Sequence, residues 1–185
     1  MDHTIPPGGR VTIDAVSRRL DVSPTPVREA LARLESDGLV VKRPMAGYTT
    51  TPLLTPTEYE QLFDVREILE CAAAAHAARA ADRATAFPAM PAPTGDPGYA
   101  GHAAFTAADA AFHDAVAAAS GNPLLRDAIA RLHAHLHIHR LRFPGAASTQ
   151  AEHDTVVAAV RAHDPGAAAE AMRAHLAASR ERHRF

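Results

Sequence analysis

Four side chains in the second half of the chain have the types and spacing of metal ligands. Asp109 and His113 stand four residues apart in DAAFHDAV, so on a helix both side chains lie on the same side. His153, in AEHDTVVAAV, and His175, in EAMRAHLAAS, each share a helical face with apolar residues. Burying these polar groups unpaired is costly, and a divalent transition metal such as zinc, nickel or manganese would offset that cost. Hydrogen-bonded core histidines, or histidines on a solvated face, are the alternatives.

Helices must position these four side chains, and the chain after residue 52 has few β-rich runs. A long helix capped at Thr55 or Thr57 is predicted to reach about residue 83, with an apolar stripe through Leu62, Val65 and Leu69. Residues 85–101 contain four prolines and three glycines and predict a loop. Further helices are expected at about 103–119, 123–142, 149–163 and 166–183.

The first half contains a second group of residues suited to chemistry, in the stretch DVSPTPVREALARLESDGLV. Ser23 is a good N-cap, which puts Pro24 at the first helical position, where proline is tolerated. Gly38 is expected to end this helix. The spacing predicts an apolar stripe of Val27, Ala30, Leu31 and Leu34.

A shorter helix precedes this one and two β runs follow it. Thr12–Leu20 has its own apolar spacing, and a turn of about three residues gives a helix-turn-helix, whose second helix enters the DNA major groove. Leu39–Lys42 and Tyr48–Thr51 predict a β-hairpin wing. An ordinary helical hairpin with a solvated basic face is the alternative. The expected DNA-binding residues are Ser23, Thr25, Arg28, Arg33, Lys42, Arg43 and Gly47.

Composition narrows the class of protein. The 185 residues carry a net charge of −2, and residues 1–50 hold seven Lys and Arg against six Asp and Glu. DNA affinity would therefore have to come from local placement of charge and from dimerisation. Cys71 is the single cysteine, which excludes an internal disulfide, favours a reducing compartment and fits a small core residue. No run suits a membrane span or signal peptide, so we expect a cytoplasmic protein.

Two further features are open to more than one interpretation. Arg66, in DVREILE, could bind an anionic effector through its planar guanidinium, or pair with Glu70 one turn on. In RLHAHLHIHRLRF four histidines alternate with other residues, which on a helix spreads them over two faces. A solvated face is expected for them rather than a metal site. They are His133, His135, His137 and His139.

The N-terminal stretch VSPTPVREALARLESDGLV, followed by Gly47, resembles the signature of the GntR family of bacterial winged-helix transcription regulators. The resemblance implies binding to double-stranded DNA. Family members most often carry an Arg that contacts a base where this chain has Pro24, which leaves the preferred DNA sequence open. They also usually have another helix ahead of PPGGRV, so either the natural start lies upstream or this domain is a trimmed one.

The C-terminal stretches DAAFHDAVAAASGNPLL and EHDTVVAAVRAHDPGAAAEAMRAHL resemble the FCD effector domain of one branch of that family. The resemblance implies a metal held by Asp109, His113, His153 and His175. The expected fold is mostly α, with a winged helix-turn-helix at 1–52 and an all-α effector-binding and dimerisation bundle at 53–185. The resemblance fails at 85–101, where the family commonly has a further helix.

These features together predict a homodimeric transcription regulator, a repressor of a palindromic operator, and not an enzyme. A small organic acid would bind at an open position on the metal, and Arg66 is its candidate protein contact. Two alternatives stay open. One is a metal-dependent hydrolase that uses the same Asp/His site, although no His-Glu-x-x-His helix is present. The other is a regulator in which the metal is structural or is itself the signal.

Overall fold

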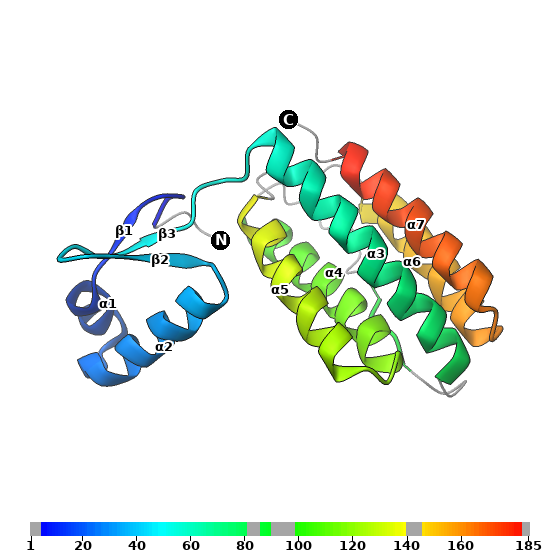
Figure 1. The fold of residues 1–185 in the computed structure, drawn as a ribbon, viewed down its shortest axis with the longest axis horizontal. Coiled ribbons are helices and arrows are strands. Elements are labelled where there is room, and N and C mark those ends of the chain that lie inside the picture. The colour runs from blue at the N-terminus through cyan, green and yellow to red at the C-terminus, as the bar shows by residue number, and fades with distance from the viewer. Residues whose placement is uncertain (1–4, 81–85, 90–98, 140–145, 183–185) are drawn as a thin grey trace. The chain divides into compact units, whose positions relative to one another are not determined.

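The computed structural model describes residues 5–80, 86–89, 99–139 and 146–182. The chain divides into two compact units, Met1–Leu54 and the residues from Thr55 onward, with Ala134–His139 assigned to the first. The first unit contains two helices and a small sheet, and the second is helical, as Figure 1 shows. The predicted fold class, a winged helix-turn-helix followed by an all-α bundle, is confirmed.

The first unit is a helix-turn-helix with a three-stranded antiparallel sheet. The sheet order is β1-β3-β2, with Val11 opposite Tyr48 and Lys42 opposite the same tyrosine from the other side. The strand β1 was not predicted, because two residues carry no readable alternation. The elements are β1 (Arg10–Val11), α1 (Ile13–Leu20), α2 (Pro24–Ser36), β2 (Val40–Arg43) and β3 (Gly47–Thr50).

Helix α2 begins and ends where the sequence predicts. Ser23 has the extended backbone of an N-cap, but its side chain makes no capping hydrogen bond. One physical reason is that the third helical residue is Pro26, which lacks the N–H that such a cap would bind. At the other end Gly38 has φ +73°, and its N–H donates to the Glu35 carbonyl at 3.0 Å. This left-handed C-terminal glycine turns the chain into the wing.

The core of the first unit buries fewer residues of α2 than the predicted apolar stripe contains. In α2 the side chains of Val27 and Leu31 are buried against the sheet, whereas Ala30 is exposed and Leu34 is 37% exposed. Leu20 at the end of α1 is 62% exposed. The predicted stripe was therefore wrong for Ala30 and Leu34, because the sheet packs only against the face of α2 centred on Val27 and Leu31. The buried cluster is Val11, Val27, Leu31, Val40 and Tyr48.

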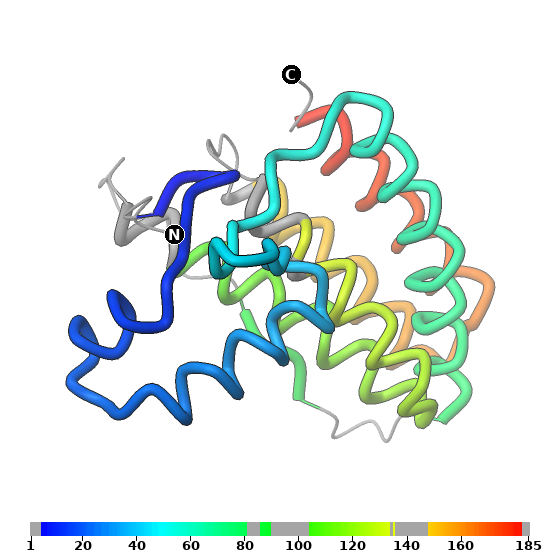
Figure 2. The backbone as a smooth tube through the Cα atoms, turned by 60° about the vertical axis from the view of Figure 1, so that its left-hand side comes forward, coloured from blue at the N-terminus to red at the C-terminus, as the bar shows by residue number. Residues whose placement is uncertain are grey.

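The second unit is a bundle around one long helix, α3 (Pro56–Ala80). Helix α3 packs against α7 and α6 on one side and α4 on the other, as Figure 1 shows, and Figure 2 shows α3 and α7 running side by side. Thr55 is its cap, since the Glu58 N–H donates to Thr55 Oγ1 at 3.2 Å. The other helices are α4 (Tyr99–Ala119), α5 (Pro123–His139), α6 (Ala146–Arg161) and α7 (Pro165–Arg182).

Two expectations about this bundle need correction. Helix α4 begins at Tyr99, so the predicted loop over 85–101 is helical at its C-terminal end, while residues 86–89 are irregular. Val65, expected in the apolar stripe of α3, is 43% exposed, and Arg66 and Glu70 are buried instead. The buried face of α3 is centred on these two charged residues, which shifts the stripe away from Val65.

Small side chains fill most of the bundle core. Cys71 is buried among them as expected, and burial raises the pKa of its thiol to about 11. Alanines allow close helix packing around the larger groups. The cluster consists of Cys71, Ala74, Ala77, Ala78, Phe112, Val116, Val156, Val160, Ala168, Met172 and Leu176. Among the helices that the structure describes, none is long and apolar enough to cross a membrane.

Candidate metal centre and DNA-contact surface

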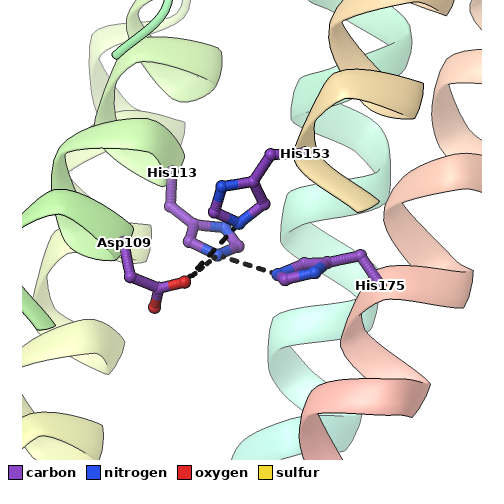
Figure 3. A group of neighbouring side chains, drawn as sticks. All are labelled: Asp109, His113, His153 and His175. Atoms are coloured by element: carbon purple, nitrogen blue, oxygen red, sulfur yellow. Dashed lines mark hydrogen bonds and ion pairs between the residues drawn. The ribbon is translucent and has the colours of Figure 1, made fainter. Parts of the chain in front are cut away.

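The four predicted ligand residues meet inside the bundle. Asp109 and His113 come from α4, His153 from α6 and His175 from α7, and their side chains converge as Figure 3 shows. Each is 1% exposed. One potential ligand atom from each residue lies within 4.8 Å of all the others. The structure thus brings together residues that are up to 66 positions apart in the sequence.

The spacing of these atoms fits a single metal ion. Asp109 Oδ1 lies 3.5 Å from His153 Nε2 and 3.8 Å from His113 Nε2, and the Nε2 atoms of His113 and His175 are 3.2 Å apart. Ligand atoms on one tetrahedral zinc are about 3.3 Å apart, because each lies about 2.0–2.1 Å from the metal. In the described part of the chain neither ring nitrogen of His153 has a hydrogen-bond partner. The donor set and its spacing suit a divalent cation.

A carboxylate fixes the far side of His175. Its Nδ1 donates to Glu152 Oε2 at 2.8 Å, and Arg182 donates to both oxygens of Glu152, at 2.6 and 2.8 Å. Burial opposes the ionisation of Glu152, but the bonds from Arg182 and His175 lower its pKa to about 2. Glu152 is therefore an anion. The proton of His175 stays on Nδ1, and the lone pair of Nε2 faces the centre.

Burial also sets the charge of the histidines. Desolvation lowers the pKa of His175 to about 4, although its hydrogen bond to Glu152 acts in the opposite direction. Desolvation lowers the pKa of His153 as well. Both imidazoles are neutral near pH 7, which is the form that binds a metal. The ring of His153 is stacked on Phe112, with centroids 3.6 Å apart. The aromatic wall excludes water from that side of the site.

A second buried polar group adjoins the first and includes Arg66. The Arg66 side chain is fully buried, and its Nε donates to Glu70 Oε1 at 2.7 Å, so the predicted Arg66–Glu70 pair is present. Its NH2 donates to His133 Nε2 at 3.2 Å, and its guanidinium lies over the Phe63 ring at 4.9 Å. The NH1 atom is buried without a hydrogen-bond partner among the described residues. The guanidinium is thus held by Glu70, His133 and Phe63.

The expectation for His133 was wrong. It was assigned to a solvated face, but it is 5% exposed and lies beside Arg66, Glu70 and His113. The rotation of α5 about its axis decides which of the alternating histidines points inward, and that rotation comes from packing of residues such as Ile129 on α3 and α4. His135 is half-buried. The side chains of His137 and His139 lie outside the described residues.

Sequence analysis overlooked three residues around the site. Glu70 was considered only as a partner of Arg66, and Glu152 and Arg182 were not considered. Glu152 is adjacent to His153 in the sequence, which could have marked it. No local pattern pairs Glu152 with Arg182, because that contact depends on the packing of α6 against α7.

The residues expected to bind DNA lie on exposed parts of the first unit. Thr25, Arg28 and Arg33 are exposed on α2, and Lys42 and Arg43 are exposed on β2. Gly47 begins β3 with φ +86°, and a Cβ there would lie 3.0 Å from the Val11 carbonyl oxygen. This close approach is a conformational reason for glycine in the wing. The exposed set is Ser23, Thr25, Arg28, Arg33, Lys42 and Arg43.

We expect the chelated protein to lose stability as the pH falls from about 6.5 to about 4. The pKa of His175 is about 4 in the fold and about 6.5 when unfolded, so the unfolded chain binds the extra proton in this window. From His175 alone, the free energy of unfolding should fall by at most about 3 kcal/mol. Denaturant titrations across the window measure this loss. His175→Gln should reduce the slope, and an equal slope in that variant would contradict the assignment.

The fold resembles solved structures along nearly its whole length. McbR/YncC of E. coli is 18% identical, with a TM-score of 0.70. The match covers 95% of this chain and 86% of the McbR/YncC chain. A GntR transcriptional regulator from Rhodococcus sp. RHA1 is 22% identical, with a TM-score of 0.69. The match covers 97% of this chain and 89% of the Rhodococcus chain. At these identities the likeness establishes the fold alone.

Sequence comparison identifies the family. An uncharacterized HTH-type transcriptional regulator in the TAR-I ttuE-ttuC' intergenic region of Agrobacterium vitis is 40% identical over 72 residues, 39% of this chain. The chain thus matches only 42% of that relative's length. The model of bacterial regulatory proteins of the gntR family matches residues 1–49, and the FCD domain model matches 61–178. GntR is a non-enzymatic family, which removes the hydrolase alternative. The chain belongs to the GntR family of regulatory proteins and carries an FCD domain.

Proposed function

We propose that this chain is a transcription regulator whose DNA binding is controlled by a small carboxylate at a metal ion. Residues 1–52 bind the operator, and residues 53–185 bind the effector and form the dimer. Asp109, His113, His153 and His175 hold a divalent ion, which is zinc, nickel or manganese. The protein represses transcription in the cytoplasm, and effector binding relieves the repression.

The observation that carries this proposal is the pair of imidazole nitrogens facing each other. His113 Nε2 and His175 Nε2 are 3.2 Å apart, and each ring has a carboxylate at its Nδ1, from Glu70 and Glu152. The contact between the two Nε2 atoms is a hydrogen bond only if one of them carries a proton. If both rings are neutral with their protons on Nδ1, two lone pairs face each other and repel. A cation between them, also bound by Asp109, removes this repulsion and supports a functional metal rather than a set of core histidines.

Effector binding follows from the coordination number. Four protein ligands fill a tetrahedral site, but they leave one position open on a five-coordinate metal and two on a six-coordinate one. A carboxylate is a suitable ligand for such a position. Arg66 supplies a second contact, because its buried NH1 donates to no described group. The two winged helices of a dimer must have the spacing that fits the two half-sites of the operator. A ligand that binds the dimer more tightly in one arrangement than in another would shift the population between them and so change operator binding.

Arg28 is expected to contribute directly to operator binding. The side chain is exposed near the N-terminus of α2, the end that enters the major groove in this motif. Arg28→Ala should weaken binding by about 1–3 kcal/mol, roughly ten- to a hundredfold. Gel shifts on DNA selected by the wild-type protein from a random pool measure the effect. Arg79→Ala, an exposed arginine of α3, is the matched control, and unchanged binding by Arg28→Ala would refute the assigned recognition helix.

We expect a symmetric homodimer in solution. One recognition helix contacts too few base pairs for specific binding, and a dimer reads two half-sites of a palindromic operator. Light scattering at micromolar concentration should give twice the mass of the 19.6 kDa chain. A monomer that binds a single half-site with full affinity would contradict this prediction.

Metal removal should destabilise the helical unit. An ion bound by α4, α6 and α7 stabilises the fold by about 2.7 kcal/mol when its free concentration is a hundred times its dissociation constant. Chelation should therefore lower the melting temperature, and His153→Ala and His175→Ala should lose the metal. His135→Ala is the control and should retain it. Purified protein that neither contains metal nor is stabilised by zinc, nickel or manganese would disprove the metal site.

Arg66→Lys should separate effector binding from metal binding. Lysine keeps the charge beside Glu70 but lacks the third nitrogen of the guanidinium fork. Organic acids that raise the melting temperature of the metal-loaded wild type should lose this effect in the variant, with metal content unchanged. Arg173→Lys, at an exposed pair with Glu67, is the matched control. A full effector response in Arg66→Lys would exclude Arg66 from the effector site.

A further inference from the structure

Glu70 joins the two buried polar groups of the bundle. It is 2% exposed, and both of its oxygens are in use. Oε1 accepts from Arg66 Nε at 2.7 Å and lies 3.3 Å from His133 Nε2. Oε2 forms an ion-pair contact with His113 Nδ1. One carboxylate therefore connects a proposed metal ligand to the proposed effector contact.

The surroundings of Glu70 keep it ionised. The Arg66 guanidinium donates to Oε1 at 2.7 Å, and a charge-assisted bond of this kind stabilises the carboxylate anion. In a neutral imidazole, an anionic oxygen at Nδ1 favours the tautomer with its proton on that nitrogen, so that Nε2 keeps its lone pair. For His113, Nε2 is the nitrogen that faces Asp109 and His175.

The three histidines of the site differ in their outer contacts. His175 is oriented by Glu152, which is 23% exposed and is fixed by Arg182. His153 is oriented by stacking on Phe112, and its Nδ1 contacts no described hydrogen-bonding group. Only His113 is oriented by a carboxylate that is itself fully enclosed and paired with Arg66. Its orientation is thus sensitive to what Arg66 binds.

We propose that Glu70 is a positioning residue of the metal centre, which fixes the Nδ1–H tautomer and the ring orientation of His113 and links them to Arg66. This inference rests on the proposed metal site for its effect on metal affinity. Glu70, His113 and His133 also lie close enough together to hold a metal ion. Because Arg66 Nε occupies Oε1 of Glu70, we assign Glu70 to orienting His113 rather than to binding the ion.

Metal affinity gives the first test. Glu70→Gln should raise the dissociation constant for zinc about ten- to a hundredfold, as loss of an outer carboxylate does at other metal sites. Glu67→Gln, a half-exposed glutamate on the same helix, should leave it unchanged. Removing only Glu70 leaves the Arg66 charge buried and can prevent folding. The double variant Arg66→Met/Glu70→Leu removes both charges and should show the same loss of affinity.

Spectroscopy separates positioning from a merely structural role. Nitrogen-15 NMR of histidine-labelled, metal-free protein should place the His113 proton on Nδ1 in the wild type. In Arg66→Met/Glu70→Leu a measurable fraction should move to Nε2. In the cobalt-loaded protein, the visible absorption bands should shift in the Glu70 variants and not in Glu67→Gln.

The outcomes distinguish this inference from the proposed function. If the wild type binds metal and the folded Glu70 variants keep its affinity, its His113 tautomer and its cobalt spectrum, Glu70 does not position His113 and the metal site stands. If the wild type binds no metal, the metal function fails, and the His113 tautomer in the metal-free protein still decides whether Glu70 positions the ring.

Discussion

The burial of a carboxylate and three imidazoles within a helical core is the constraint on which the second unit depends. Polar groups removed from water need partners, and an unpaired buried charge costs several kcal/mol. In this bundle the partners are arranged in two layers. Asp109 and the Nε2 atoms face a common centre, while Glu70, Glu152 and Phe112 fix the outer sides of the rings. Alanine-rich helices bring these layers close together.

This arrangement explains the unusual face of α3. A long amphipathic helix normally turns an apolar stripe toward the core. Helix α3 instead turns Arg66 and Glu70 inward, and both are nearly free of solvent. The pair is stable there because Nε and NH2 of the arginine, and both oxygens of the glutamate, have partners. A cation in the adjacent site would hold α4, α6 and α7 through their own side chains, so its affinity and the packing of these helices are linked.

The first unit works by different means. Its core cluster consists of five buried apolar side chains among the residues that the structure describes, and its charge is close to balanced. Binding to DNA would therefore depend on where single groups stand rather than on a strongly basic surface. Pro24 fixes the start of α2, and Pro26 removes one of the two N–H groups that the Ser23 hydroxyl could bind. A short three-stranded sheet holds the wing beside it.

The sequence by itself determined the helix-turn-helix with its wing, the succession of helices after residue 52, and the four residues that meet in the bundle. It did not determine the strand β1 or the start of α4 at Tyr99. Local signals are strong here: prolines, glycines and caps mark where helices begin and end, and i,i+4 spacing fixes which side chains share a face. The capping residue Thr55 acts as its local pattern indicates.

Tertiary structure alone decided which groups surround the four predicted ligand residues. The inward turn of His133, the exposure of Val65 and the Glu152–Arg182 pair depend on how each helix is rotated against its neighbours. That rotation is set by the sum of many contacts between residues distant in the sequence, such as Ile129 on Ala73 and Ala117. A helical period gives the relative positions of side chains on one helix, but not the direction of that face in the assembled bundle.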